Sequence, residues 1–274
     1  MALPVAIQLY SLREEAEKDL KGTLKAVKEM GYDGVEFAGL YGHSFEEVKA
    51  ILEDLGLRAI SAHVPMDDML AAPAEVFGAY KSLGCDYIAI PYAPEDRRPD
   101  APGFPQTLQQ IADLGAAAKA AGLVLLYHNH DFEFVKLGDE YGLDVLYASV
   151  PADLLQTEVD TCWVKVAGVD PAEYVRKYTG RAPVVHLKDY TMGTNAKDAE
   201  LYELIGIASK GTAGADAFSF RPVGHGCQDL PALLAASTDA GAKWVVVEQD
   251  RPAKGQTAME SAALSREALK VLGW

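Results

Sequence analysis

The stretch VLLYHNH at residues 124–130 joins a run of apolar, strand-forming residues to a cluster of polar ones. Three later stretches repeat this arrangement, and they are LLQTEVD at 154–160, VVHLKD at 184–189 and WVVVEQD at 244–250. Aliphatic and β-branched residues favour buried strands, and each of these runs ends in side chains that can bind a metal. We therefore predict four buried strands of one design, each with polar residues at its carboxyl end.

A second repeat extends this pattern over most of the chain. An amphipathic helix, a glycine and an apolar strand recur in KEMGYDGVEF (28–37), EDLGLRAISAH (53–63), KSLGCDYIAI (81–90), KAAGLVLLYH (119–128) and TDAGAKWVVVE (238–248). The glycines stand where a helix end needs a left-handed residue. Eight strands are expected, starting near residues 5, 34, 57, 87, 123, 154, 184 and 244.

Strands that alternate with helices indicate a parallel sheet, and eight such units are typical of a closed barrel. We therefore predict that residues 1–274 form a single α/β domain, a (β/α)8 TIM barrel. A doubly wound open sheet is the alternative. Its glycine-rich dinucleotide loop is missing after the first strand, where the chain reads QLYSLREE (8–15).

Charge and cysteine content narrow the function classes. The chain carries 25 Lys and Arg against 40 Asp and Glu, a formal net charge of −15. This excess of acid disfavours a nucleic-acid partner and an anionic membrane surface. Three widely spaced cysteines without a C-x-x-C pair indicate no disulfide framework, and the first residues read as a strand rather than a signal peptide. We expect a cytoplasmic protein, and a homo-oligomer is compatible with the sequence.

Alternation along each strand selects the residues that face the barrel interior. In VVHLKD, His186 and Lys188 share a face, and in LLQTEVD, Glu158 and Asp160 share one. Burying unpaired charges is costly, so a ring of them at one end indicates a shared cation. We predict a divalent metal held by the residues His128, Asp160, His186 and Glu248. Two imidazoles and two carboxylates suit Mn²⁺, our first choice, and also Zn²⁺, Co²⁺, Fe²⁺ or Mg²⁺.

The connection between Lys188 and Leu230 is unusually long and polar. Long connections at the carboxyl ends of strands are more often functional than idle. We expect residues Tyr190 to Phe220 to lie over the barrel mouth as a lid. Asp229 is expected to cap the helix that follows, with Pro231 in its first turn.

These motifs together resemble one known family. The order of IQLYSLR, GVEFAG, ISAHV, LLYHNHDFEF, EVDTCWV, VVHLKD and VEQD resembles the sugar phosphate isomerase/epimerase family, the xylose-isomerase-like TIM barrels. That family includes inosose dehydratases, ketose 3-epimerases and, more distantly, endonuclease IV. The resemblance covers nearly the whole chain. It implies a divalent metal at the ends of the fifth to eighth strands, where the same four residues stand.

One departure from the family pattern concerns the fifth strand. Ketose epimerases usually carry glutamate where this chain has His128, followed by Asn129 and His130. The family's glutamates in the fifth and eighth strands move protons on opposite faces of the substrate. A metal-bound imidazole has no free basic nitrogen at the coordinating position. His-x-His in this strand is similar to inosose dehydratases, which favours elimination chemistry.

The resemblance implies proton abstraction beside a carbonyl, leading to an enediolate that a metal stabilises. Glu248 is the first choice for the base, and Glu158 and His63 are candidates for the acid or an orienting group. Lys188 either neutralises an enolate oxygen or pairs with the carboxylates. The expected substrate contacts are Gln8, Glu36, His63, His130 and Lys188, and His130 could instead be a ligand or a partner of one.

Three functions remain open at this point. The first is a metal-dependent isomerase or epimerase acting on a keto sugar or related polyol. The second is a dehydratase or lyase acting on an inosose or a 3-keto glycoside. The third is a nuclease like endonuclease IV, which the net charge of −15 disfavours. No glycine-rich phosphate cradle is visible, so an unphosphorylated sugar or cyclitol is the expected substrate.

Overall fold

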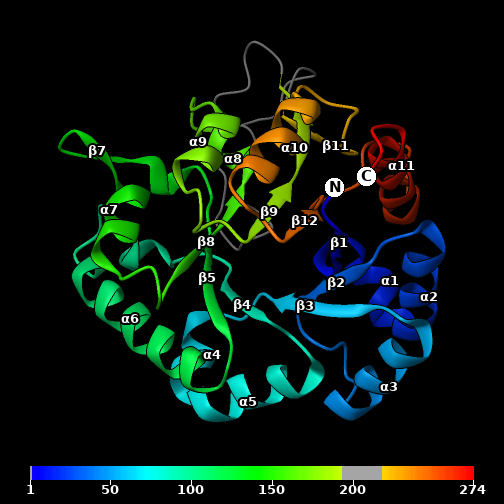
Figure 1. Ribbon diagram of the computed structural model, residues 1–274, viewed down its shortest axis with the longest axis horizontal. Coiled ribbons are helices and arrows are strands. Elements are labelled where there is room, and N and C mark those ends of the chain that lie inside the picture. The colour runs from blue at the N-terminus through cyan, green and yellow to red at the C-terminus, as the bar shows by residue number, and fades with distance from the viewer. Residues whose placement is uncertain (1, 193–217) are drawn as a thin grey trace.

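A ring of eight parallel strands forms the centre of the protein (Figure 1). The computed structural model describes residues 2–192 and 218–274. The ring strands are β1 Val5–Gln8, β2 Gly34–Phe37, β3 Arg58–Ala62, β4 Tyr87–Ile90, β5 Val124–His128, β8 Gln156–Asp160, β9 Val184–Leu187 and β12 Trp244–Val247. Each begins within two residues of its predicted start.

The strand order identifies the architecture. Neighbouring strands follow the order β3-β2-β1-β12-β9-β8-β5-β4, and every pair in this order is parallel. A parallel bridge between His63 and Ala89 links β3 to β4, so the ring is nearly closed. The predicted (β/α)8 barrel is confirmed. Two short antiparallel ribbons were not predicted: β6 Lys136–Leu137 with β7 Glu140–Tyr141, and β10 Asp189–Thr191 with β11 Ser219–Arg221.

Helices surround the ring on its outer side (Figure 1). They are α1 Arg13–Lys18, α2 Leu20–Met30, α3 Phe45–Leu55, α4 Met66–Ala71, α5 Pro73–Leu83, α6 Phe104–Ala120, α7 Gly142–Ser149, α8 Thr161–Val166, α9 Pro171–Lys177, α10 Leu230–Asp239 and α11 Ala258–Val271. Short 3₁₀ helices are η1 Leu9–Leu12, η2 Glu95–Arg97 and η3 Phe132–Phe134. Capping boxes start α3 (Ser44 with Glu47) and α11 (Thr257 with Glu260).

Two helix-end predictions are confirmed. Asp229 accepts a hydrogen bond from the Ala232 N–H at 3.1 Å and so caps α10, with Pro231 in the first turn. The five glycines between helices and strands all have positive φ, from 62° to 105°, and they are Gly31, Gly56, Gly84, Gly122 and Gly241. The chain therefore turns from helix to strand where the repeat predicted.

Side chains alternate between two buried layers along each strand. Val185, Leu187, Val245 and Val247 pack in the core between the ring and the helices. The barrel interior holds a separate apolar cluster, whose members are Ala6, Ile60, Ala89, Leu126, Val184, Trp244 and Val246. Its members precede the polar residues along the same strands, as Leu126 precedes His128 and Val184 precedes His186, so the polar strand ends lie above it.

A β-bulge in β3 interrupts the regular pairing of this strand with β2. Between β2 and β3 the register shifts, so that Val35 pairs with Ala59 and Glu36 pairs with Ser61, leaving Ile60 as the extra residue. A Cβ at Gly34 would lie 2.9 Å from the Ile60 Cγ2 atom and 2.8 Å from a backbone oxygen. Glycine at position 34 therefore gives Ile60 room inside the barrel.

The expected lid spans Tyr190 to Phe220. Most of it, residues 193–217, lies outside the described residues. Its two ends form the β10–β11 ribbon. There, Tyr190 and Phe220 are buried in one apolar cluster with Trp163. The lid itself stays a prediction.

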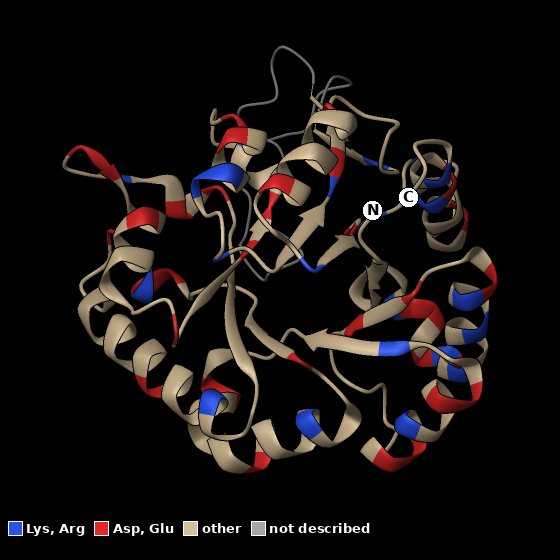
Figure 2. Ribbon diagram, viewed as in Figure 1, with Lys and Arg blue, Asp and Glu red and all other residues tan. Residues whose placement is uncertain are grey.

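The charged side chains are spread over the outer helices. Figure 2 shows Lys and Arg interspersed with Asp and Glu in the described part of the chain. Among the described helices, none is long and apolar enough to cross a membrane. The predicted absence of nucleic-acid and membrane partners stays a prediction.

Candidate metal centre and active site

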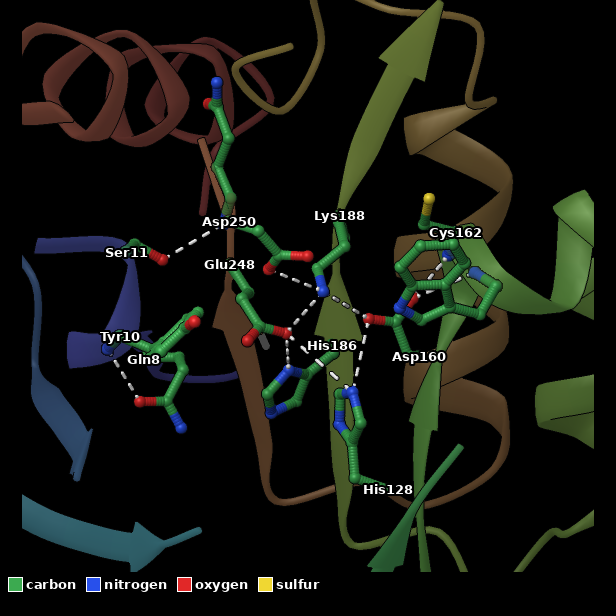
Figure 3. A network of polar contacts seen from close by, with 12 residues as sticks. Gln8, Tyr10, Ser11, His128, Asp160, Cys162, His186, Lys188, Glu248 and Asp250 are labelled. Carbon is green, nitrogen blue, oxygen red and sulfur yellow. Dashed lines mark hydrogen bonds and ion pairs between the residues drawn. The ribbon is translucent and has the colours of Figure 1, made fainter. Parts of the chain in front are cut away.

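The carboxyl ends of β5, β8, β9 and β12 bring the four predicted metal ligands together (Figure 3). One potential ligand atom from each of His128, Asp160, His186 and Glu248 lies within 4.8 Å of the others. All four side chains are buried. His186 Nδ1 is 2.9 Å from Glu248 Oε2, and His128 Nε2 is 3.6 Å from Asp160 Oδ2. We refer to these four residues as the upper cluster.

The two carboxylate oxygens of Asp160 have different roles, one in capping a helix and one in the upper cluster. Its Oδ1 atom accepts hydrogen bonds from the backbone N–H groups of Cys162 (2.8 Å) and Trp163 (3.1 Å), and so caps α8. Its Oδ2 atom is buried, accepts no hydrogen bond, lies 3.3 Å from the Lys188 ammonium nitrogen, and faces His128. The Asp160 N–H also donates to Asn129 Oδ1 at 3.0 Å, which ties the ends of β5 and β8 together. The capping contacts hold the second oxygen toward the centre.

The donor set of the upper cluster fits a divalent metal. Two imidazoles and two carboxylates form a mixed nitrogen and oxygen set suited to Zn²⁺, Mn²⁺, Co²⁺ or Fe²⁺. Asp160 Oδ2 faces the cluster and accepts no hydrogen bond, and its ion pair with Lys188 at 3.3 Å leaves it free to bind a cation as well. Burial raises the pKa of Asp160 to about 6, although Lys188 opposes this shift. The residues present therefore match the cofactor that the sequence predicted.

Lys188 binds three carboxylates at the rim of the upper cluster (Figure 3). Its Nζ atom lies 2.9 Å from Asp250 Oδ1, 3.0 Å from Glu248 Oε2 and 3.3 Å from Asp160 Oδ2. Burial would lower the pKa of Lys188, but these carboxylates outweigh it and raise the pKa well above its usual value. The ammonium group is thus held in its charged form beside the proposed base.

A second group of polar residues lies beneath the upper cluster. Glu36 and Glu158 are fully buried, and His63 Nε2 lies 3.1 Å from the first and 2.7 Å from the second. Gln8 Nε2 donates to Glu36 Oε1 at 2.7 Å. Burial would lower the pKa of His63, but the two carboxylates raise it to about 10. We refer to Gln8, Glu36, His63 and Glu158 as the lower cluster.

A pocket of about 360 Å³ opens above these clusters, within the usual range for small-molecule sites. Five of the predicted site residues line it: His63, His128, His130, Lys188 and Glu248. The remaining predicted residues lie below or behind its surface: Gln8, Glu36, Glu158, Asp160 and His186. Gln8 and Glu36 are not among the residues that line the pocket, and their contact with a substrate stays a prediction.

His130 forms part of an aromatic wall of the pocket. Its ring stacks on Phe132 with centroids 5.0 Å apart and meets Tyr92 edge-on at 6.2 Å. Burial and the charge of Lys188 lower the pKa of His130 well below its usual value. A neutral imidazole at this position suits a hydrogen-bonding contact with an uncharged substrate.

Sequence reasoning missed two acidic residues. Asp250 lines the pocket and binds Lys188, and its position two residues after Glu248 on the same face could have revealed it. Glu133 is fully buried and accepts hydrogen bonds from the Tyr127 hydroxyl (2.8 Å) and the His130 N–H (2.7 Å). It lies in the short 3₁₀ helix η3, where strand alternation gives no guidance.

Comparison with known proteins establishes the family. The family model for the xylose isomerase-like TIM barrel matches residues 24–272. The chain belongs to this family. Sugar isomerases and epimerases and inosose dehydratases occur among its similar proteins, so the chain is a member of a family of enzymes.

The similar curated proteins are inosose dehydratases. One from Clostridium botulinum (strain Alaska E43 / Type E3) is 28% identical over 162 residues, which cover 57% of this chain and 50% of that protein. Another, from Clostridium perfringens (strain 13 / Type A), is 36% identical over 76 residues, covering 28% and 25%. The matched regions thus span half or less of these relatives.

Solved structures share the fold at lower identity. A sugar phosphate isomerase/epimerase from Parabacteroides distasonis is 21% identical, with a TM-score of 0.77 and 98% of each chain covered. The IolI protein, whose crystal structure contains a zinc atom, is 15% identical with a TM-score of 0.67 and 98% of each chain covered. These similarities extend the barrel assignment over nearly the whole chain.

Proposed function

We propose that this protein is a divalent-metal-dependent lyase that removes water from an inosose, or an alcohol from a 3-keto glycoside. The observation that carries this proposal is the one-sided placement of carboxylates in the pocket. Among the described residues that line it, the carboxylates are Glu248 and Asp250, both at the end of β12. The wall at the end of β5 offers imidazoles, from His128 and His130.

This placement favours elimination over epimerisation by two carboxylates. Epimerisation needs one group to take a proton from one face and another to return it to the opposite face. Here Glu248 can take the proton, but the opposite strand presents His128, whose nitrogen would hold the metal. The similarity to inosose dehydratases over part of the chain supports the same choice. Isomerase or epimerase activity, our first prediction from the sequence, is the second candidate, because it begins with the same proton abstraction.

The proposed reaction divides the roles among pocket residues. Glu248 accepts the proton from the carbon beside the carbonyl, and the electron pair of that C–H bond becomes the new C=C bond. The C–O bond of the neighbouring carbon breaks, and His63 gives the departing oxygen its proton. Lys188 lies 3.0 Å from Glu248 and balances the negative charge that develops on the carbonyl oxygen. A divalent metal in the upper cluster would supply Lewis-acid polarisation of the same carbonyl.

The pocket favours an unphosphorylated substrate. Lys188 is the only lysine or arginine among the described residues that line it, and three carboxylates already surround its ammonium group. A phosphate group would meet the negative charges of Glu248 and Asp250, and the cationic His63 is already paired with Glu36 and Glu158. A neutral ring with several hydroxyls fits the imidazole and carboxylate lining better.

The test is an assay of the purified protein in D₂O with NMR detection. Mn²⁺ or Zn²⁺ is added, and the substrates are a panel of inososes, ketoses and 3-keto glycosides. A lyase gives an unsaturated ketone with release of water or alcohol, whereas an isomerase gives a deuterated, rearranged sugar without release. Glu248→Gln is the matched control and should lose either activity. Rearrangement without elimination across the panel would overturn the lyase proposal in favour of the isomerase.

A further inference from the structure

The two imidazoles of the upper cluster each face two groups of carboxylates. His128 Nε2 points toward Asp160, at 3.6 Å, while its Nδ1 lies 3.3 Å from Glu158 Oε2. His186 Nδ1 is 2.9 Å from Glu248 Oε2, while its Nε2 is 2.9 Å from Glu36 Oε1. In both rings one nitrogen therefore faces the upper cluster and the other faces the lower cluster.

This arrangement assigns a role to the lower cluster. A metal-binding histidine usually donates its second ring N–H to a carboxylate or carbonyl, which fixes the ring and strengthens the ligand. We propose that Glu158 and Glu36 are positioning residues for the two metal-binding imidazoles, Glu158 for His128 and Glu36 for His186. The inference rests on the proposed metal centre, and it gives these two glutamates a role other than proton transfer or substrate binding.

The lower cluster is built to hold both carboxylates in place. His63 Nε2 bridges Glu36 and Glu158, and Gln8 donates a hydrogen bond to Glu36. Both glutamates are fully buried, and each keeps one oxygen without a hydrogen-bond partner. These partnerless oxygens are Glu36 Oε2 and Glu158 Oε1, whereas the imidazoles face Glu36 Oε1 and Glu158 Oε2. The positioning role therefore rests on the approach of the two ring nitrogens, at 2.9 and 3.3 Å. The angles at His128 Nδ1 and His186 Nε2 fall short of full hydrogen bonds here, as is common in polar sites before a ligand binds.

A second set of four residues, two from each cluster, offers an alternative place for a metal. His63, His128, Glu158 and His186 also place ligand atoms within 4.8 Å of one another. However, His128 and His186 already belong to the upper cluster, and His63 is occupied by two carboxylates at 2.7 and 3.1 Å. A single ion in the upper cluster with an orienting layer beneath it uses each ring nitrogen of His128 and His186 once. The number of ions bound per chain separates the two arrangements.

The first test is a zinc titration of the full-length, metal-free protein. Glu158→Gln and Glu36→Gln keep the shape of each side chain but remove its charge. Each should weaken Zn²⁺ binding by roughly 10–100-fold, the usual effect of removing such a partner, while one ion still binds per chain. Asp144→Asn is the matched control, because Asp144 accepts hydrogen bonds from Tyr174 and Tyr178 away from the strand ends. It should bind zinc as the wild type does.

Three other outcomes are decisive. Zinc affinity in both glutamine variants equal to the wild type would overturn the positioning role. Two zinc ions per wild-type chain, with one lost in Glu158→Gln, would make the lower cluster a second metal site instead. Failure of the wild type to bind zinc would overturn the proposed metal centre itself.

A second test needs no variant. Nitrogen-15 NMR of the zinc-loaded wild-type protein reports which ring nitrogen of each histidine carries hydrogen. The positioning role requires hydrogen on Nδ1 of His128 and on Nε2 of His186. Zinc on those nitrogens, with hydrogen on the opposite ones, would overturn the inference while leaving the metal centre intact.

Discussion

The two ends of the barrel interior are built from the same strands but differ in chemistry. At the amino-terminal end, Val184 and Val246 pack with Trp244 in an apolar cluster. Two residues further along the same strands, His186 and Glu248 belong to the upper cluster. Because residues two apart share a face, only two positions along each strand separate the packed core from the charged site.

The difference shows how this fold separates stability from function. Apolar packing at one end stabilises the barrel through burial. At the other end, buried charges are kept only because they pair with one another, as Lys188 does with Asp160, Glu248 and Asp250. Changes at the polar end should therefore affect chemistry most, and changes at the apolar end should affect folding most.

The largest effect is expected at the polar end, for Glu248→Gln. This change keeps an oxygen ligand but removes the base, so turnover should fall by about two to four orders of magnitude. Some metal should remain bound. Glu158→Gln, measured at saturating metal on the same substrate, should recover most of the wild-type turnover. If Glu158→Gln instead loses turnover by this amount and Glu248→Gln keeps most of it, Glu158 is the base.

At the apolar end, we expect a large loss of folding stability without a loss of turnover. Trp244 is 3% exposed and lies in the interior cluster. Trp244→Ala should lower the free energy of unfolding by about 3–5 kcal/mol. Urea denaturation measures this loss, and Trp244→Phe should lose less. Turnover per folded molecule should stay at the wild-type level, and a fall as large as that of Glu248→Gln would refute the separation of the two ends.

A buried acid beside the site should give a pH-dependent effect. Burial raises the pKa of Glu133 to about 8, and Asp131 adds to this, while hydrogen bonds from Tyr127 and His130 oppose it. The folded chain therefore holds this proton where the unfolded chain releases it, and stability falls as pH rises above about 4.5 toward 8.

The variant Glu133→Gln removes this titration. Between pH 5 and pH 7 the wild type should lose about 2–3 kcal/mol of stability relative to the variant, at ~1.36 kcal/mol per pH unit. Urea denaturation at both pH values measures the difference. The exposed control Glu140→Gln should follow the wild-type profile. Parallel profiles for Glu133→Gln and the wild type would mean that Glu133 is ionised in the folded protein.

The smallest effect is expected outside both ends, at the capping box of α3. Ser44 and Glu47 exchange side-chain and backbone hydrogen bonds on the exposed surface. Ser44→Ala should lower the free energy of unfolding by about 0.5–2 kcal/mol, with turnover unchanged. A modest fall in the melting temperature measures this loss. Ser82→Ala, at another exposed serine, should have less effect still.

The strand pattern could be predicted because helix–glycine–strand repeats and two-residue alternation are local properties. They placed His128, Asp160, His186 and Glu248 at neighbouring strand ends, and the structure brings these residues within 4.8 Å. The strand starts and the cap at Asp229 follow from the same local rules.

Other features depend on contacts between distant segments. The bulge at Ile60 arises from the register between β2 and β3. The position of Glu36 behind His186 depends on side chains from strands that are far apart in sequence. Glu133 belongs to the short 3₁₀ helix η3, outside the strand repeat. Alternation could show that Glu36 and His186 face inward, but it could not show which of them reaches the pocket.

The most direct test of the metal centre is elemental analysis of the purified protein after incubation with Mn²⁺ and removal of free metal. The wild type and Trp244→Ala should each retain one ion per folded chain. His128→Ala, Asp160→Ala, His186→Ala and Glu248→Ala should each lose most of it. Full occupancy in His128→Ala would move the fifth-strand ligand to His130. Full occupancy in all four variants, or no metal in the wild type, would contradict a metal centre at this end of the barrel.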